Sequence, residues 1–350
     1  MARTKLLMLL AAAVAIGTVL AVAGWLWLAH VDRARLAQPL TDVAEPRLVD
    51  VQPGSSLKAV ASRLAADGLL AHPGSWIREA RREGLASRLR AGEFLVKPGM
   101  TGRELLDEMV AGRVYLHSLT IPEGWTFRQA FEAIEHHPAV RVTLDGADDA
   151  TLRKALGLGD KALEGMLVPD TYLFARGTTD VTLLRQAHER EQQELDAAWA
   201  ARAPDLPLTS AYQALILASI IEKETGAPDE RPLIAGVFVN RLRRGMRLQT
   251  DPTVIYGMGS SFDGNLRRAD IERDTPYNTY TRAGLPPTPI ALAGRDALRA
   301  AVHPATTDDL YFVATGRGDG RHRFARTLAE HNDNVARYIA TLRGAAHEAR

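Results

Sequence analysis

Cysteine is absent from the 350 residues of this chain. Disulfide bonds, thiolate metal sites and a cysteine nucleophile are therefore excluded, whereas the compartment stays open because exported proteins need not contain disulfides. An excess of charge of one sign is absent as well, since 43 Lys and Arg residues stand against 42 Asp and Glu residues. Without a global basic field, we expect no nucleic-acid partner.

Short motifs of several enzyme classes are also missing. The patterns HExxH, GxSxG, GxGxxG and the Walker motif do not occur, which argues against metal hydrolysis, a nucleophile elbow and nucleotide binding. We therefore expect no metal site and no cofactor. At 350 residues the chain can still bury a sizeable core, and its length suggests two or three domains.

The amino terminus carries one long apolar run. Residues 6–29 contain no charged side chain, and at about 1.5 Å per residue they can span a hydrocarbon core of roughly 30 Å. A cleaved signal peptide is the alternative, but its apolar region usually has only about 7 to 15 residues, and Trp25 and Trp27 suit a membrane interface. We expect an uncleaved anchor. Counting charges leaves its orientation open, because two basic residues lie on each side of the run: Arg3 and Lys5 before it, Arg33 and Arg35 after it.

Residues 31–46 are polar and are expected to form a linker. Beyond them one pattern recurs three times, over residues 49–68, 94–113 and 119–138: a β-branched run, a turn with Pro and Gly, a Ser or Thr, and apolar residues at helical spacing. The pattern predicts strand-turn-helix units and small α+β modules in place of one long sheet. Turn chemistry alone explains the Pro and Gly residues, so the repeats say little about function.

Helical signals dominate the second half of the chain. A polar amphipathic helix is expected to end by Pro204, and a nearly all-apolar helix follows over residues 214–224. In the next helix Asp229 can cap the start, Pro232 suits the first turn and Gly245 can end it. These helices predict a mainly helical core.

Two glutamates, Glu222 and Glu224, close the apolar helix. Residues two apart on a helix point about 200° away from each other, so we do not expect them to act as a two-carboxylate pair. The face of Glu224 is the more apolar one, because Leu217, Ile220 and Ile221 precede it. A carboxyl group in such surroundings is harder to ionise, as a general acid near neutral pH requires. A structural role stays open, in which Glu224 pairs with Arg241, Arg243 or Arg244.

Two later segments, residues 247–259 and 275–290, are expected to be irregular. They concentrate hydroxyl, amide and tyrosine side chains, which suit hydrogen bonding and ring stacking against a sugar. Loop composition by itself also accounts for part of this pattern. His303 is expected to have a turn or core role. The candidate substrate-binding residues are Gln249, Thr250, Asp251, Tyr256, Tyr277, Asn278, Thr279 and Tyr280.

The motifs together resemble the endolytic murein transglycosylases, the MltG or YceG-like family. The resemblance runs in order through ASIIEKET, GVFVNRL, GMRLQTDPTVIYG, YNTY, GLPPTPI, AVHPA and LYFVA, with TIPEG and EGMLVPDTY before them, and covers roughly residues 48–338. It implies an α+β fold and a single-pass inner-membrane protein whose amino terminus is cytoplasmic. The implied domains are a terminus and transmembrane anchor over 1–30, a linker over 31–46, a LysM-like module over 47–117 and a mainly helical periplasmic catalytic domain over 118–345.

The resemblance also implies a mechanism with one catalytic residue. In the family the catalytic glutamate is followed directly by Ser or Thr, which selects Glu224, since Thr225 follows it and Lys223 follows Glu222. Glu224 would protonate the glycosidic oxygen between N-acetylmuramic acid (MurNAc) and N-acetylglucosamine (GlcNAc), then act as base on the C6 hydroxyl, closing a 1,6-anhydro ring without water. Asp251 and Asp270 are candidates for electrostatic support.

Peptidoglycan glycan strands are the implied substrate, and peptidoglycan synthases (penicillin-binding proteins) are the implied partners, with termination of nascent strands as the expected outcome. Two alternatives stay open. A muramidase that uses water needs a second carboxylate near the cleft, for which Asp251 is the best candidate. A non-catalytic scaffold would instead bind glycan through the strand-turn-helix units.

Overall fold

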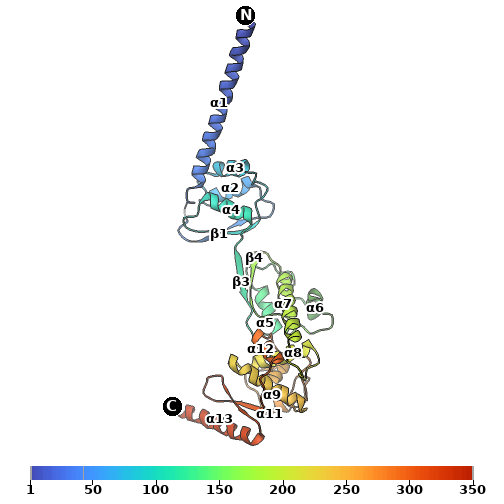
Figure 1. The fold of residues 1–350 in the computed structure, drawn as a ribbon. Helices are drawn as coiled ribbons and strands as arrows, with labels where there is room; N and C mark the ends of the chain where they lie inside the picture. The colour runs from blue at the N-terminus through green and yellow to red at the C-terminus, as the bar shows by residue number, and fades with distance from the viewer. Residues whose placement is uncertain (1, 42, 349–350) are drawn as a thin grey trace. The chain divides into compact units, whose positions relative to one another are not determined.

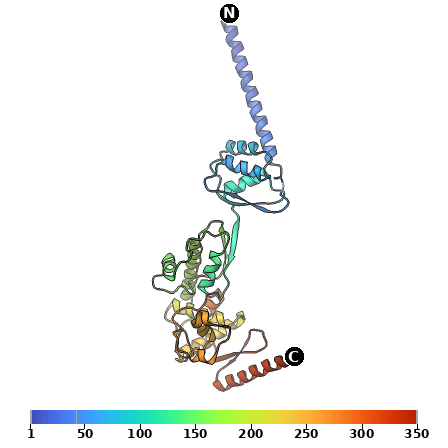
Figure 2. The same cartoon turned by 180° about the vertical axis from the view of Figure 1, so that it is seen from behind.

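The computed structural model describes residues 2–41 and 43–348. These residues form two compact units, one of residues 1–117 and 174–176 and the other of residues 118–173 and 177–350. The first unit thus contains three residues from later in the chain, Phe174–Arg176. Figures 1 and 2 show the fold from two sides.

The first helix, α1 (Ala2–Leu36), carries the apolar run. Residues 3–27 are exposed, and no other helix in the described part of the chain is both long and apolar enough to cross a membrane. The helix continues beyond the run to Leu36, so the linker expected over residues 31–46 is helical in its first part. The physical reason is that no helix breaker follows Ala29 until Pro39.

The rest of the first unit is a small α+β module. Strands β1 (Arg47–Val51) and β2 (Gly92–Val96) pair antiparallel, with Val49 opposite Phe94. Ser56 and Thr101 accept hydrogen bonds from backbone N–H groups at the starts of α2 (Leu57–Ala66) and α4 (Gly102–Ala111). The buried Trp76 donates to the carbonyl oxygen of Gly102 at 2.9 Å and joins two helices. The three helices of the module are α2 (Leu57–Ala66), α3 (Pro73–Arg82) and α4 (Gly102–Ala111).

The second unit is mainly helical. Strand β3 (Leu116–Thr120) pairs with β4 (Thr171–Ala175), and β5 (Tyr311–Ala314) pairs antiparallel with β6 (His322–Ala325). The second unit contains the β5–β6 sheet and residues 118–120 and 171–173 of the β3–β4 sheet. The three predicted strand-turn-helix units are confirmed, as is the absence of one long sheet among the described residues. The helices are α5 (Phe127–Glu135), α6 (Asp149–Leu156), α7 (Asp180–Ala200), α8 (Ala211–Glu224), α9 (Arg231–Arg243), α10 (Asp251–Met258), α11 (Arg268–Glu272), α12 (Arg295–Val302) and α13 (Leu328–Glu348), with short 3₁₀ turns at Pro228–Glu230 and Gly259–Ser261.

The centre of this unit is α8, whose residues are all buried from Ala214 to Ile221. It contacts α12, α9 and α7, as expected for a helix that is apolar on every side. Figure 1 shows α8, α9 and α12 close together. Burial of this helix fixes the position of the polar residues at its carboxyl end.

Close packing of α9 yields a stability prediction. A Cβ atom on Gly236 would lie 2.6 Å from the carbonyl oxygen of Ala305 and 2.9 Å from Cγ2 of Thr307. Gly236→Ala should therefore destabilise the protein by about 1–3 kcal/mol, although alanine favours helices. Denaturant unfolding measures this loss. Gly226→Ala is the control, because nothing lies within 4 Å of its Cβ position, and an equal loss in both variants would contradict the prediction.

Candidate active site

Glu224 is the last residue of α8. The three apolar residues before it on its face, Leu217, Ile220 and Ile221, are fully buried. The helix ends there because Thr225 adopts an extended backbone, with φ −142° and ψ 135°. Glu224 borders a cleft of about 550 Å³ that lies entirely within the second unit. The helix thus delivers one carboxyl group from an apolar core to a cavity large enough for sugar units.

The surroundings of Glu224 keep its carboxyl group partly protonated. Burial raises its pKa to about 7, and the negative charge of Asp251 contributes in the same direction. The hydroxyl group of Thr250, which donates a hydrogen bond to Oε1 of Glu224, and the positive charge of Arg241 oppose this rise. Both protonation states are therefore populated near neutral pH, as a group that first gives and then takes a proton requires.

Thr250 is held in place by the loop that follows α11. Its backbone N–H donates to Oγ1 of Thr279 at 3.0 Å, and the N–H of Gln249 donates to the carbonyl oxygen of Thr279 at 3.1 Å. Gln249 has a φ of 52°, a left-handed conformation that is unfavourable for residues other than glycine. The segments that contain Thr250 and Thr279 thus meet next to the carboxyl group of Glu224.

The cleft has two walls of different origin. The first holds Glu224, Arg241, Leu248, Gln249, Asp251 and Tyr280. Within it the hydroxyl group of Tyr280 donates to Oδ1 of Asp251 at 2.6 Å, and burial raises the pKa of Tyr280. The second wall comes from the β5–β6 hairpin and α13, and its residues are Tyr311, Phe312, Val313, Ala314, His322, Leu328, His331, Asn332 and Val335.

Arg241 is a buried cation in the first wall. Its Nε donates to the carbonyl oxygen of Leu310 at 2.6 Å, and its Nη1 donates to that of Leu248 at 2.8 Å. The guanidinium group lies 5.1 Å from the ring centroid of Tyr311, within the range of a cation–π contact. These contacts fix a positive charge close enough to Glu224 to lower the pKa of its carboxyl group.

Glu222, by contrast, has the contacts of a structural residue. One carboxyl oxygen accepts from Arg231 at 3.1 Å, and the other accepts from the backbone N–H of Gly294 at 3.0 Å. In the structural alternative, Glu224 is expected to pair with a nearby arginine of the next helix. It is Glu222 that forms such an ion pair, with Arg231. Within the described residues, the hydrogen bond of Glu224 comes from Thr250 instead.

Residues 49–337 match the model of the YceG-like family. The chain belongs to the YceG-like family. Two curated relatives are endolytic murein transglycosylases: that of Bacillus subtilis (strain 168) is 40% identical over 179 residues, 51% of this chain and 49% of the relative. That of Streptococcus pneumoniae (serotype 2, strain D39) is 32% identical over 198 residues, 54% of this chain and 35% of the relative.

A solved structure extends the likeness. The 2.6 Å crystal structure of a YceG-like protein from Listeria monocytogenes matches with a TM-score of 0.50 and 30% identity, covering 83% of this chain and 99% of the other. The matched region spans about half, or less, of the length of the two curated relatives. The resemblance noted in the sequence is thus confirmed at the level of the family.

Several residues expected to bind substrate lie outside the walls of the cleft in this YceG-like chain. Tyr256 donates to Glu164 at 3.2 Å, and the hydroxyl group of Tyr277 lies 2.8 Å from that of Thr288. Asn278 is fully buried, and its Nδ2 donates to the carbonyl oxygens of Ile271 and Arg273 at 2.8 and 2.7 Å. Its amide group is therefore used within the loop and is closed to a sugar.

Thr279 and Asp270 also differ from expectation. Thr279 is buried, and its hydroxyl oxygen accepts a hydrogen bond from the backbone N–H of Thr250. Asp270 accepts from the backbone N–H of Arg267 at 3.0 Å at the start of α11 and does not line the cleft. Of the eight expected substrate-binding residues, Gln249, Asp251 and Tyr280 line the cleft, and Thr250 donates a hydrogen bond to Glu224.

The prediction that residues 247–259 are irregular is wrong for their second part. Residues 251–258 form α10, with Asp251 in its first turn and Pro252 at its start. Asp and Pro favour helix starts as well as turns, so composition did not distinguish the two. Because Tyr256 lies on this helix, its side chain turns toward Glu164 and away from the cleft-lining set.

Glu164 has a buried carboxyl group that no spacing pattern in the sequence indicated. It accepts from the N–H of Phe127 at 2.8 Å and from Tyr256, and burial raises its pKa to about 7. It does not line the cleft, and its contact with Phe127 places it at the start of α5. We therefore regard it as structural. Within the described residues, no group of three or more His, Asp or Glu side chains is arranged to hold a metal ion.

Proposed function

We propose that this chain is an endolytic lytic transglycosylase that cleaves the bond between MurNAc and GlcNAc within peptidoglycan strands. The observation that carries the proposal is the carboxyl group of Glu224, which ends a buried helix, borders a cleft and has a pKa raised to about 7. Both curated relatives are named endolytic murein transglycosylases.

In the proposed reaction Glu224 gives its proton to the glycosidic oxygen, and the bond from that oxygen to C1 of MurNAc breaks. The resulting carboxylate takes the proton of the C6 hydroxyl group, whose oxygen forms a new bond to C1. The product ends in 1,6-anhydro-MurNAc, no water is consumed and Glu224 is protonated again. The nucleophile belongs to the same sugar, which gives it a high effective concentration, so a second catalytic carboxylate is not needed.

The neighbours of Glu224 have supporting roles in this reaction. Arg241 favours the carboxylate form after the proton has left, and the hydroxyl group of Thr250 orients it. Gln249, Asp251 and Tyr280 are proposed to contact the sugar, because they line the cleft beside Glu224.

The proposed setting of the enzyme rests on α1 and on the resemblance of the sequence to the family. We propose that this helix is a single-pass inner-membrane anchor with a cytoplasmic amino terminus and that the catalytic unit is periplasmic. The α+β module is proposed to be LysM-like, peptidoglycan synthases are proposed partners, and termination of nascent strands is the proposed role. The length and apolar character of α1 support the anchor.

A water-using muramidase is the second candidate, because Asp251 lines the same cleft as Glu224. Mass spectrometry of products from purified glycan strands separates the two reactions. Ends in 1,6-anhydro-MurNAc support the transglycosylase, whereas reducing ends alone would show that water is the nucleophile. A non-catalytic scaffold would release no product from the wild type.

The pKa of Glu224 predicts the pH dependence of cleavage. A raised pKa means that the protonated form is present below about pH 7 and is lost above it. The initial rate should therefore fall with rising pH, with a midpoint near pH 7, to be measured between about pH 3.5 and 9 so that the ordinary glutamate value lies within the range. A midpoint near the ordinary glutamate value of about 4.3 would contradict the proposed role of Glu224 as acid.

A further inference from the structure

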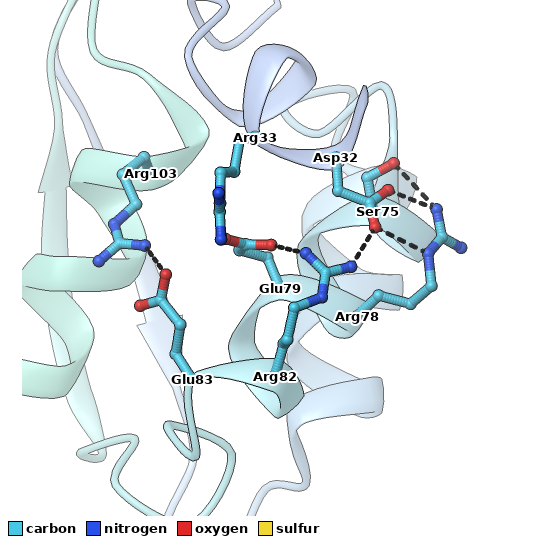
Figure 3. A network of polar contacts seen from close by, with 8 residues as sticks. All are labelled: Asp32, Arg33, Ser75, Arg78, Glu79, Arg82, Glu83 and Arg103. Carbon is cyan, nitrogen blue, oxygen red and sulfur yellow. Dashed lines mark hydrogen bonds and ion pairs between the residues drawn. The ribbon is translucent and has the colours of Figure 1, made fainter. Parts of the chain in front are cut away.

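The carboxyl end of α1 is joined to α3 by a buried polar network, shown in Figure 3. The carboxylate of Asp32 is fully buried and accepts from Nε and Nη2 of Arg78 at 3.0 and 2.6 Å and from Arg82 at 2.8 Å. Glu79, also buried, pairs with Arg33 of α1 at 3.1 Å and with Arg82. Two carboxylates on opposite helices thus fasten α1 to α3.

In this network the acidic side chains are buried between the helices, whereas several of the basic side chains are exposed. The side chains of Asp32 and Glu79 are 0% and 1% exposed, whereas those of Arg33 and Arg78 are 67% and 42% exposed. Arg35 and Arg81 are exposed as well. The acidic groups are therefore hidden between the helices, and the outer face of α3 and the adjoining turn of α1 is positively charged.

This positively charged face lies close to the carboxyl end of the apolar run. The guanidinium group of Arg82 is 5.8 Å from the ring centroid of Trp25, and Trp25 precedes Ala29 by about 6 Å along the helix axis. Within this unit, Figures 1 and 2 both draw α3 beside the base of α1 and β1 at the opposite end. If residues 6–29 span a bilayer, Trp25 lies at an interface, and α3 must lie among the lipid headgroups.

We propose that α3 is a membrane-surface helix and that its exposed Arg81, with Arg35 of α1, binds the phosphate groups of anionic phospholipids, while the exposed parts of Arg33 and Arg78 add positive charge to the same face. Guanidinium groups bind phosphate in two-pronged hydrogen bonds, and a cluster of basic residues next to a membrane span favours anionic lipid. The inference rests on the proposed anchor role of α1. It adds a lipid partner for the module and a defined depth.

Because the chain has no cysteine, a single introduced cysteine can carry a label that measures how close α3 lies to the bilayer. Full chains carrying Arg81→Cys or Leu48→Cys, each with a fluorophore, are placed in lipid nanodiscs that contain a headgroup-attached quencher. Leu48 is the control, because it is 39% exposed and lies on β1. We expect quenching at least about threefold stronger at position 81. Equal quenching at both positions in inserted protein would overturn the inference and leave the anchor intact, whereas failure of the chain to insert would overturn the anchor and this inference together.

The choice of lipid is tested on the unlabelled chain. Hydrogen exchange of α3 amides should be severalfold slower in nanodiscs with phosphatidylglycerol than in nanodiscs of phosphatidylcholine alone. Arg81→Gln should reduce this difference, since it removes an exposed cation that is not part of the network in Figure 3. Equal exchange in the two lipids would refute binding of anionic phosphate groups.

Discussion

Glu224→Gln is expected to lower the rate of glycan-strand cleavage by about 10²- to 10⁴-fold, the usual contribution of a general acid–base group. The amide has nearly the same volume as the carboxyl group and retains an oxygen that can accept the hydrogen bond of Thr250. The variant should therefore fold, but it has no proton to give to the glycosidic oxygen. Release of soluble fragments from purified strands measures the loss.

Glu222→Gln is the matched control at the end of the same helix. Its side-chain oxygen can still accept from the N–H of Gly294, while the ion pair with Arg231 is lost. We expect most activity to remain, together with a loss of stability of about 1–3 kcal/mol in denaturant unfolding. Full activity of Glu224→Gln, or equal inactivation of both variants, would refute the choice of Glu224.

Arg241→Met is expected to have the second-largest effect, on both stability and pH dependence. Removal of the guanidinium group leaves the buried carbonyl oxygens of Leu248 and Leu310 without their donors, which should cost about 3 kcal/mol or more. The loss of a cation that lowers the pKa of Glu224 should raise this pKa further. The decline of activity with rising pH should then begin at a higher pH than in the wild type.

Arg241→Lys separates the charge of this residue from its hydrogen-bonding shape. Lysine keeps a cation but cannot reproduce the planar fork, so stability should still fall while the alkaline decline stays near that of the wild type. Other titratable groups border the cleft, namely Asp251, Tyr280, Tyr311, His322 and His331. An alkaline decline at the same pH in Arg241→Met and the wild type would show that Arg241 does not act on Glu224.

Local spacing made part of the site predictable. The apolar run before Glu224 required a buried helix, and the 3.6-residue repeat placed Glu222 and Glu224 on different sides. The structure gives them different partners: Thr250 for one, Arg231 and Gly294 for the other. The separation of the two side chains depends on residues within two helical turns, so the sequence alone could supply it, whereas the partners come from other elements of the fold.

The far wall of the cleft was not predictable in this way. Tyr311, His322 and His331 line it, yet they follow Glu224 by more than 80 residues, and tertiary packing alone brings them near. Tyr311 was quoted only as part of the LYFVA motif. For Asn278 the residue was noticed but its role was not predictable. An asparagine that binds a sugar and one that stabilises its own loop cannot be distinguished by residue type.

The helical continuity between the apolar run and Asp32 makes this junction sensitive to insertions and deletions. Adding one residue between Ala29 and Asp32 would turn the following side chains by about 100° around the helix axis. Because Asp32 stays bonded to Arg78 and Arg82, α3 would turn with it relative to the apolar run. A flexible tether would accept such changes in length, whereas here the number of residues sets the direction in which the module faces.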